Sequence, residues 1–125
     1  MERFTKLTEA MNAHAMQDYP REAVGIVTKD YQYIPCKNIS QHPKITFFLD
    51  PADLVRHDGN IWGIFHSHPG AEQPIPSKED KVSAAFQQYK FLVGFNNKFY
   101  IYWVEDGIDA LKFDEFKEEH LVSNP

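Results

Sequence analysis

Two histidines separated by one residue stand at the end of an apolar segment, residues 61–65, and are followed after a loop by Asp80. Successive side chains of a strand point to opposite faces, so His66 and His68 are expected to lie side by side. Imidazole nitrogens and carboxylate oxygens are common zinc ligands. Asp80 is the candidate third ligand, since its loop and helix can fold back toward the histidines. Two nitrogens and one oxygen leave a fourth tetrahedral position for water, which is typical of catalytic zinc sites.

The segment that joins the histidines to Asp80 is stiff and ends at a predicted helix start. It contains three prolines within residues 69–76, and Ser77 then opens the sequence S-K-E-D. Each piece alone has an ordinary alternative, because a His-x-His pair often binds no metal and S-K-E-D is a variant of the helix capping box. The specific signal is the combination of H-x-H-P, a short loop and S-x-x-D.

In this combination the sequence resembles the JAMM (MPN+, Mov34/PAD-1) family of zinc metallopeptidases, whose signature adds a glutamate on an early element. Glu22 matches that glutamate, within residues 19–26, which are similar to the family's P-x-E-x-C-G segment. The resemblance covers residues 11–104. It is strongest to the JAMM domains of tailed-phage tail assembly proteins of the lambda tail protein K type, to which Asn38 and residues 47–54 (F-x-x-D-P-x-D-L) are also similar.

The resemblance implies a role for each matched residue. His66, His68 and Asp80 would bind a zinc ion, which lowers the pKa of its water toward about 7 and polarises the scissile carbonyl. Glu22 would take the proton from that water and pass it to the leaving amine. Ser77 would donate a hydrogen bond to the oxyanion of the tetrahedral intermediate.

The sequence departs from the family pattern at two places. The spacer between His68 and Ser77, residues 69–76, is one residue longer than is usual in the family. Val24 stands where the family often has cysteine, at a position expected to serve packing. The chain also lacks the insertions with which family deubiquitinases hold ubiquitin, which disfavours ubiquitin as the substrate.

Periodicity and turn residues predict the elements that position these residues. Apolar residues at helical spacing predict a first helix over residues 3–18. Asp50 and Pro51 predict a helix start, and Asn96-Asn97 predict a tight hairpin turn. The helix that begins at Ser77 is expected to carry an apolar stripe of Val82, Ala85, Phe86 and Tyr89. Strands are expected over residues 23–28, 31–37, 45–49, 61–65, 91–95, 98–104 and 108–113, a turn at 105–107, and a terminal helix over 114–121.

These elements predict one α/β (mixed α+β) domain over residues 1–125, with a mixed, mostly antiparallel curved sheet flanked by helices. The resemblance implies the MPN/JAMM fold, whose architecture is similar to that of cytidine deaminases. Deaminase chemistry itself needs a Pro-Cys-x-x-Cys ligand pair, which a chain with a single cysteine, Cys36, cannot supply.

Charge and hydropathy narrow the class of partner. The net charge is -5, and residues 105–125 contain seven acidic and two basic residues, so that the rest of the chain sums to zero. An acidic C-terminal segment on a neutral body predicts neither nucleic-acid nor membrane binding. The N-terminal residues lack an apolar signal-peptide core, so we expect a cytoplasmic protein, in the host cytoplasm if the chain is phage-encoded.

Two functions remain open from the sequence. The leading hypothesis is a zinc-dependent metallopeptidase that hydrolyses a peptide or isopeptide bond in a protein or peptide substrate, with phage tail proteins as possible partners. The alternative is a non-catalytic zinc-binding scaffold of a tail or other assembly. The substrate, the cleavage site and the oligomeric state do not follow from the sequence.

Overall fold

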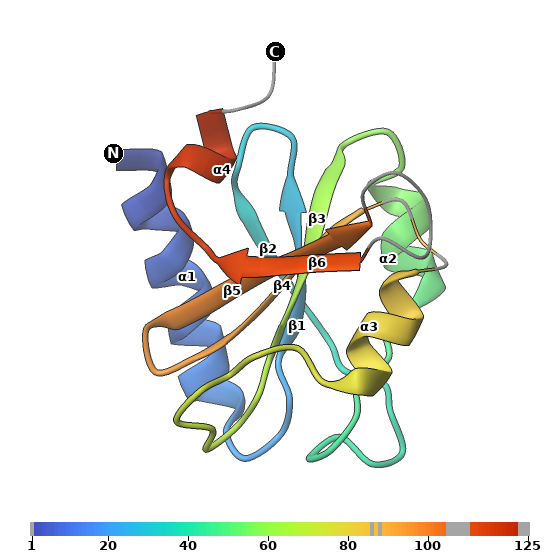
Figure 1. Ribbon diagram of the computed structural model, residues 1–125. Helices are drawn as coiled ribbons and strands as arrows, with labels where there is room; N and C mark the ends of the chain where they lie inside the picture. The colour runs from blue at the N-terminus through green and yellow to red at the C-terminus, as the bar shows by residue number, and fades with distance from the viewer. Residues whose placement is uncertain (1, 86, 88, 105–110, 123–125) are drawn as a thin grey trace.

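β3 (Ile61–Ser67) is the central strand that carries the site, and all of its residues are buried. The structure is a computed structural model, and it describes residues 2–85, 87, 89–104 and 111–122. The strands form one six-stranded sheet of order β2-β1-β3-β4-β5-β6, in which only β3 and β4 pair in parallel. Figure 1 shows this sheet, whose other strands are β1 (Val24–Thr28), β2 (Tyr33–Cys36), β4 (Lys90–Phe95), β5 (Lys98–Val104) and β6 (Leu111–Glu115).

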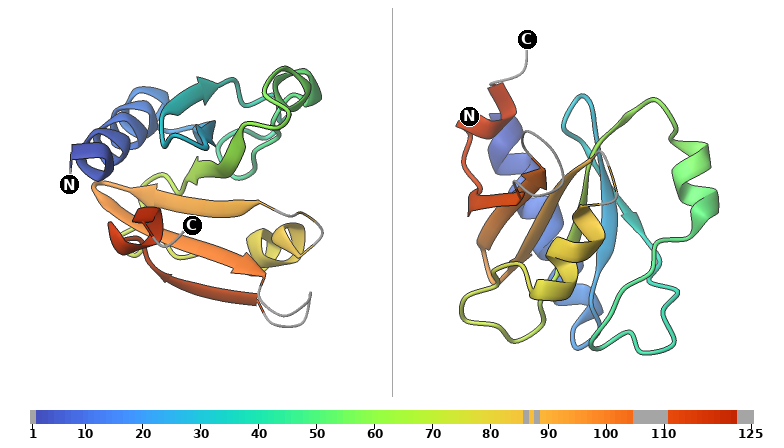
Figure 2. Two further views of the ribbon diagram at one scale, coloured as in Figure 1. Left: turned by 90° about the horizontal axis from the view of Figure 1, so that it is seen from above. Right: turned by 45° about the vertical axis from the view of Figure 1, so that its right-hand side comes forward.

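Two helices pack on opposite faces of the sheet and divide the core into two clusters. α1 (Glu2–Asp18) contacts β2, β3 and β4, and it buries Leu7, Met11 and Ala15 in the first cluster. α3 (Lys78–Ala84) contacts β5, and it buries Ala84 in the second cluster. The two helices lie on either side of the strands in Figure 2, while α2 (Pro51–Arg56) and α4 (Glu119–Val122) lie at the periphery. The mixed, mostly antiparallel sheet with flanking helices confirms the predicted fold class.

A bulge in β3 decides which of its residues face which helix. The pairing with β1 passes from Val27 opposite Gly63 to Thr28 opposite Ile61, so Trp62 is the extra residue. Beyond the bulge, Phe65 packs in the cluster with α1, whereas Ile64 packs in the cluster with α3. Since side chains alternate along a strand, the next residues on the α3 side are the two histidines.

Several predicted elements are confirmed because local chemistry fixes them. Asp50 caps α2 by accepting a hydrogen bond from the backbone N–H of Ala52, with Pro51 at the first helical position. Asn96 and Asn97 both have positive φ, 53° and 66°, as a two-residue turn between antiparallel strands requires.

The predicted strand over residues 45–49 is wrong. Among the described residues, this segment takes part in only one isolated bridge, between Asn38 and Leu49. The N–H groups of Ile45 and Thr46 turn back to the carbonyl of His42. The segment is therefore a folded loop whose apolar composition resembles that of a strand.

The predicted apolar stripe of the central helix is also wrong. α3 ends at Ala84, and Val82 is 55% exposed. The side of α3 that faces the sheet carries Asp80, which points to the histidines, and Ala84, which lies one turn later. Phe86 lies outside the described residues, while Tyr89 is partly buried against the second core cluster.

The C-terminal elements are shifted relative to the prediction. β6 (Leu111–Glu115) confirms residues 111–113 of the predicted strand and ends two residues later, whereas α4 (Glu119–Val122) begins five residues later than the predicted helix over 114–121. The predicted turn at 105–107 and the start of the predicted strand at 108 lie outside the described residues. No helix in the described part of the chain is both long and apolar enough to span a bilayer.

Candidate metal centre and active site

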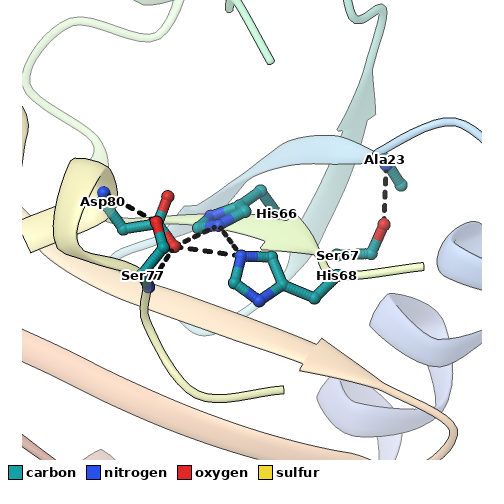
Figure 3. Close-up of polar contacts among 6 residues, drawn as sticks. All are labelled: Ala23, His66, Ser67, His68, Ser77 and Asp80. Carbon is teal, nitrogen blue, oxygen red and sulfur yellow. Dashed lines mark hydrogen bonds and ion pairs between the residues drawn. The ribbon is translucent and has the colours of Figure 1, made fainter. Parts of the chain in front are cut away.

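The two histidines and Asp80 converge on one point. The Nε2 atoms of His66 and His68 lie 3.1 Å and 3.0 Å from Oδ2 of Asp80, and they lie 3.3 Å from each other. Figure 3 shows this triangle, with the histidines at the end of β3 and Asp80 on the first turn of α3. The structure thus brings together the three residues that the sequence proposed as metal ligands.

The spacing of these three atoms fits a tetrahedral metal ion. Zinc–nitrogen and zinc–oxygen bonds of about 2.0–2.2 Å imply ligand–ligand separations of about 3.3–3.5 Å in a tetrahedron. The observed separations of 3.0–3.3 Å are within a few tenths of an ångström of that edge. One carboxylate and two imidazoles are also a donor set that zinc prefers. The cluster is therefore able to hold a metal ion.

The protonation states of the cluster also suit a cation. Burial alone would raise the pKa of Asp80, but hydrogen bonds from both histidines and from the Ser77 N–H hold the pKa well below its usual range. Burial lowers the pKa of His66, which keeps that imidazole neutral. An ionised carboxylate beside a neutral imidazole is the form that binds metals.

Aromatic packing fixes the orientation of His66. The ring of Phe47 stacks on His66 with centroids 4.3 Å apart, and Tyr102 meets it edge-on at 6.3 Å. His66 is fully buried, so its Nε2 is held toward Asp80. Phe47 lies in a loop nineteen residues before His66, and its contact with that ring was not predicted.

Glu22 reaches the same site through the pairing of β1 with β3. Val24 lies opposite His66, and Ala23 exchanges two hydrogen bonds with Ser67, one from its N–H to the Ser67 hydroxyl and one to its own carbonyl from the Ser67 N–H. Continuing this register by one residue brings Glu22 level with His68. The structure thus places Glu22 beside the triad, although forty-four residues separate it from His66.

The environment of Glu22 suits an acid–base role. Its side chain is only 7% exposed, and burial raises its pKa to about 7, with a further increase from Asp80 and an opposing effect of His68. Strongly perturbed carboxyl groups in a cleft are candidates for proton transfer.

Ser77 is the cap of α3 and also lines the site. Its hydroxyl accepts a hydrogen bond from the Asp80 N–H, and its own N–H donates to Oδ2 of Asp80, which is a complete capping box. The longer spacer before Ser77 is accommodated, since the cap is intact. Because its hydroxyl oxygen acts as acceptor here, the hydroxyl hydrogen is free to be donated to a ligand.

The described residues form a cavity of about 870 Å³ in front of this cluster. Its base contains Glu22, His68, Ser77 and Asp80. A second wall comes from the loop between β2 and α2, with Ile39, Ser40, Gln41, His42, Ile45, Thr46, Phe47 and Phe48. This volume lies within the usual range of ligand sites, about 300–1,000 Å³.

Asn38 connects Glu22 to that wall, a role that sequence reasoning missed. Its Nδ2 donates to the carbonyl oxygens of Glu22 and Thr46, at 2.9 Å and 3.0 Å. Its Oδ1 accepts from the N–H groups of Ser40 and Phe48, both at 3.0 Å. One amide side chain thereby makes hydrogen bonds to the backbone of Glu22 and to the backbone at both ends of the loop. An asparagine just after a strand and before a polar loop was the available signal.

Two other side chains of types that could bind a metal, His14 and Cys36, lie elsewhere. His14 belongs to a separate network, in which its Nδ1 lies 2.6 Å from the Tyr33 hydroxyl and its Nε2 3.4 Å from Asp18. Cys36 is half-buried, and burial raises its pKa to about 11, so the thiol is protonated at neutral pH. Neither residue lines the cavity in front of the histidines.

Comparison with known proteins agrees with the geometry. Residues 4–108 match Prok-JAB, the prokaryotic homologs of the JAB domain. The chain belongs to this family. The Prok-JAB match covers all three ligand candidates and both Glu22 and Ser77.

Two curated proteins are similar in sequence to this chain. It is 40% identical over 82 residues to the tail tip assembly protein K of Escherichia phage N15, a match that covers 62% of this chain and 33% of that protein. It is 27% identical over 92 residues to the desampylase of Haloferax volcanii, a match that covers 63% of this chain and 66% of that protein. The chain thus spans about a third of the first relative and just under two thirds of the second.

Replacing Asn38 by alanine is expected to destabilise the fold by about 1–3 kcal/mol, because several partly buried backbone groups lose their partner at once. Urea unfolding measures this change. Asn60→Ala is the control, since among the described residues the side chain of Asn60 makes a single long bond, 3.4 Å from its Oδ1 to the Lys29 N–H. Equal stability of the two variants would contradict the role of Asn38.

Replacing Glu22 by glutamine is expected to stabilise the metal-free protein at pH 8 by roughly 2–3 kcal/mol, since the wild type must then bury an ionised carboxylate, whose pKa burial raises from its ordinary value of 4.5 to about 7. The sign follows from linkage: a raised folded pKa makes the wild type lose stability as pH rises from 4.5 to 7. The gain should vanish near pH 4, where the carboxyl group is protonated in both states. Urea unfolding at both pH values in the presence of a chelator tests this, and a gain independent of pH would refute it.

Proposed function

We propose that this protein is a zinc-dependent metallopeptidase that hydrolyses a peptide or isopeptide bond. The observation that carries the proposal is a tetrahedrally spaced His66–His68–Asp80 cluster whose His68 and Asp80 share a cavity with Glu22, a buried carboxyl group whose pKa is raised to about 7. The membership of the Prok-JAB family and the similarity to a protein named desampylase support a hydrolase.

In this proposal each residue has a defined task. His66, His68 and Asp80 would hold the zinc ion. When bound, the ion supplies Lewis-acid activation of a water molecule and of the scissile carbonyl. Glu22 accepts a proton from the attacking water and delivers it to the leaving amine, which a carboxyl group titrating near neutral pH does in both directions.

Ser77 stabilises the developing negative charge on the carbonyl oxygen. Its hydroxyl oxygen is held in place by the hydrogen bond from the Asp80 N–H. Among the described residues this hydroxyl donates no hydrogen bond of its own, so its hydrogen is available to a ligand. A donor fixed before the substrate arrives costs no reorganisation during the reaction.

The substrate is proposed to be a protein or peptide, and tail proteins are the first candidates if the chain is phage-encoded, given the similarity to a tail tip assembly protein. The same similarity supports a second function, a zinc-binding scaffold within such an assembly, because assembly requires no hydrolysis. The two functions differ in one measurable respect, since only the peptidase depends on Glu22.

Purified protein supplied with zinc is expected to bind about one zinc ion per chain. His66→Ala and His68→Ala should each abolish stoichiometric binding, since two donors remain. Metal analysis after gel filtration measures the ratio. His42→Ala is the control, because His42 lines the same cavity but lies outside the metal cluster. Wild-type protein that retains no zinc would exclude both proposed functions.

Glu22→Gln is expected to retain zinc but to lower peptide hydrolysis by about 10²–10⁴-fold, because proton transfer is lost while the ligands remain. Cleavage of a synthetic peptide library, followed by mass spectrometry, measures the effect. In the wild type the rate should rise with pH to a plateau, because Glu22 must be ionised to accept a proton. The midpoint of the rise should lie at or below about 7, since the charge of the metal ion would lower the pKa of Glu22.

Ser77→Ala in the same assay should lower hydrolysis by about 10² or more. Ser83→Ala is the matched control, since Ser83 is an exposed hydroxyl on the same helix and at the same cavity. A Glu22→Gln variant as active as the wild type would eliminate the peptidase proposal. If the wild type and the Glu22→Gln variant both bind zinc but neither hydrolyses any peptide, the scaffold is favoured.

A further inference from the structure

The loop opposite the metal cluster exposes large apolar side chains to the cavity. Ile45 is 74% exposed, Phe48 65% and Ile39 45%, and all three line the cavity that contains Glu22 and Asp80. Large exposed apolar side chains gathered at one concave site mark a binding surface. We define Ile39, Ile45 and Phe48 as the apolar wall.

The apolar wall is held in place rather than loosely attached. Asn38 bonds to backbone groups at both ends of the loop, and the N–H of Ile39 donates to the carbonyl of Phe48. The side chains of Ser40 and Thr46 are also hydrogen-bonded to each other. A wall fixed in advance loses little conformational entropy when a ligand binds, which favours binding.

The charges around the cavity limit what this wall accepts. The lining residues include the carboxyl groups of Glu22, Glu79 and Asp80 but no lysine or arginine. An acidic side chain or a phosphate on the wall would meet carboxyl groups and no lysine or arginine among the described lining residues. A neutral, apolar segment meets no such penalty, and burying one large apolar side chain is favourable.

The position of the wall relates this segment to the chemistry. Phe47, the residue before Phe48, stacks on His66, so the wall begins directly beside the metal cluster. The cavity of about 870 Å³ exceeds what a single side chain fills, so it has room for several residues of an extended peptide. A peptide whose scissile bond lies at the cluster would therefore place a neighbouring side chain on the wall.

We propose that the apolar wall is the specificity site of this protein, and that it selects substrates with a large apolar side chain, such as leucine or phenylalanine, next to the scissile bond. The proposal rests on the proposed peptidase function, which it deepens by naming the substrate class. It predicts that segments with only small residues, or with acidic residues, at that position are poor substrates.

Binding to the wall is measured without turnover. The probes are two peptides identical except for one central residue, phenylalanine or glycine, added to zinc-supplied Glu22→Gln protein with labelled isoleucine methyl groups. The Ile39 and Ile45 signals should shift with the phenylalanine peptide, whose affinity should exceed that of the glycine peptide about tenfold or more. Ile75 is the internal control, since it is 44% exposed but lies outside the cavity.

Hydrolysis of the same peptides by the wild type gives a second readout. The phenylalanine peptide should be cleaved with a kcat/KM about tenfold or more above that of the glycine peptide. Phe48→Ser should remove this preference. Val55→Ser should keep it, because Val55 is 76% exposed on α2, outside the cavity.

The outcomes separate the two proposals. Shifts at Ile39 and Ile45 without any hydrolysis would overturn the peptidase, and with it the role of the wall in substrate choice, and would leave the wall as a peptide-binding surface. Hydrolysis without side-chain preference, or a preference that survives Phe48→Ser, would overturn the wall alone. Shifts of the Ile39 and Ile45 signals with protein concentration in the absence of peptide would assign the surface to self-association and also overturn the proposal.

Discussion

The antiparallel pairing of β1 with β3 is the constraint on which the candidate site depends. The register places Val24 opposite His66, and the bonds between Ala23 and Ser67 extend it to the edge of the sheet. A shift of one residue would turn Glu22 to the face covered by α1, away from the histidines. The hydroxyl of Ser67, the residue between the two histidines, thus helps to position Glu22, which lies two residues before β1.

The second constraint is the capping box of α3. Ser77 at the cap and Asp80 at the third helical position are spaced as helix geometry requires, and Oδ2 of Asp80 accepts the Ser77 N–H while it faces both histidines. The S-x-x-D spacing therefore has a physical origin, since it joins the helix start and the third candidate ligand in one unit. A loop of different length before Ser77 leaves that unit unchanged, which explains how the longer spacer of residues 69–76 is accommodated.

The sequence predicted the parts of the site that local rules determine. Alternation along a strand placed His66 and His68 on one face, and capping preferences located the start of α3. Glu22 followed only from family resemblance, because no periodicity reports which residues of two distant strands lie opposite each other. Residues 45–49 were wrongly predicted to be a strand because composition shows only that they are apolar. Whether such a segment forms a strand depends on its backbone hydrogen bonds, which here go to His42 and Asn38.

The loop that carries the apolar wall also shapes the chemistry of Glu22. The Glu22 N–H donates to the carbonyl of Pro43, and its carbonyl accepts from Asn38, so the loop holds the backbone of the residue with which it shares a cavity. Removing that carboxyl group from water is the main cause of its raised pKa. Substrate bound on the wall would exclude further water from the same cavity and strengthen each electrostatic interaction there. In the proposed function, recognition of an apolar side chain and the raised pKa of Glu22 would therefore both depend on one folded loop, and Asn38 would affect both through its bonds to that loop.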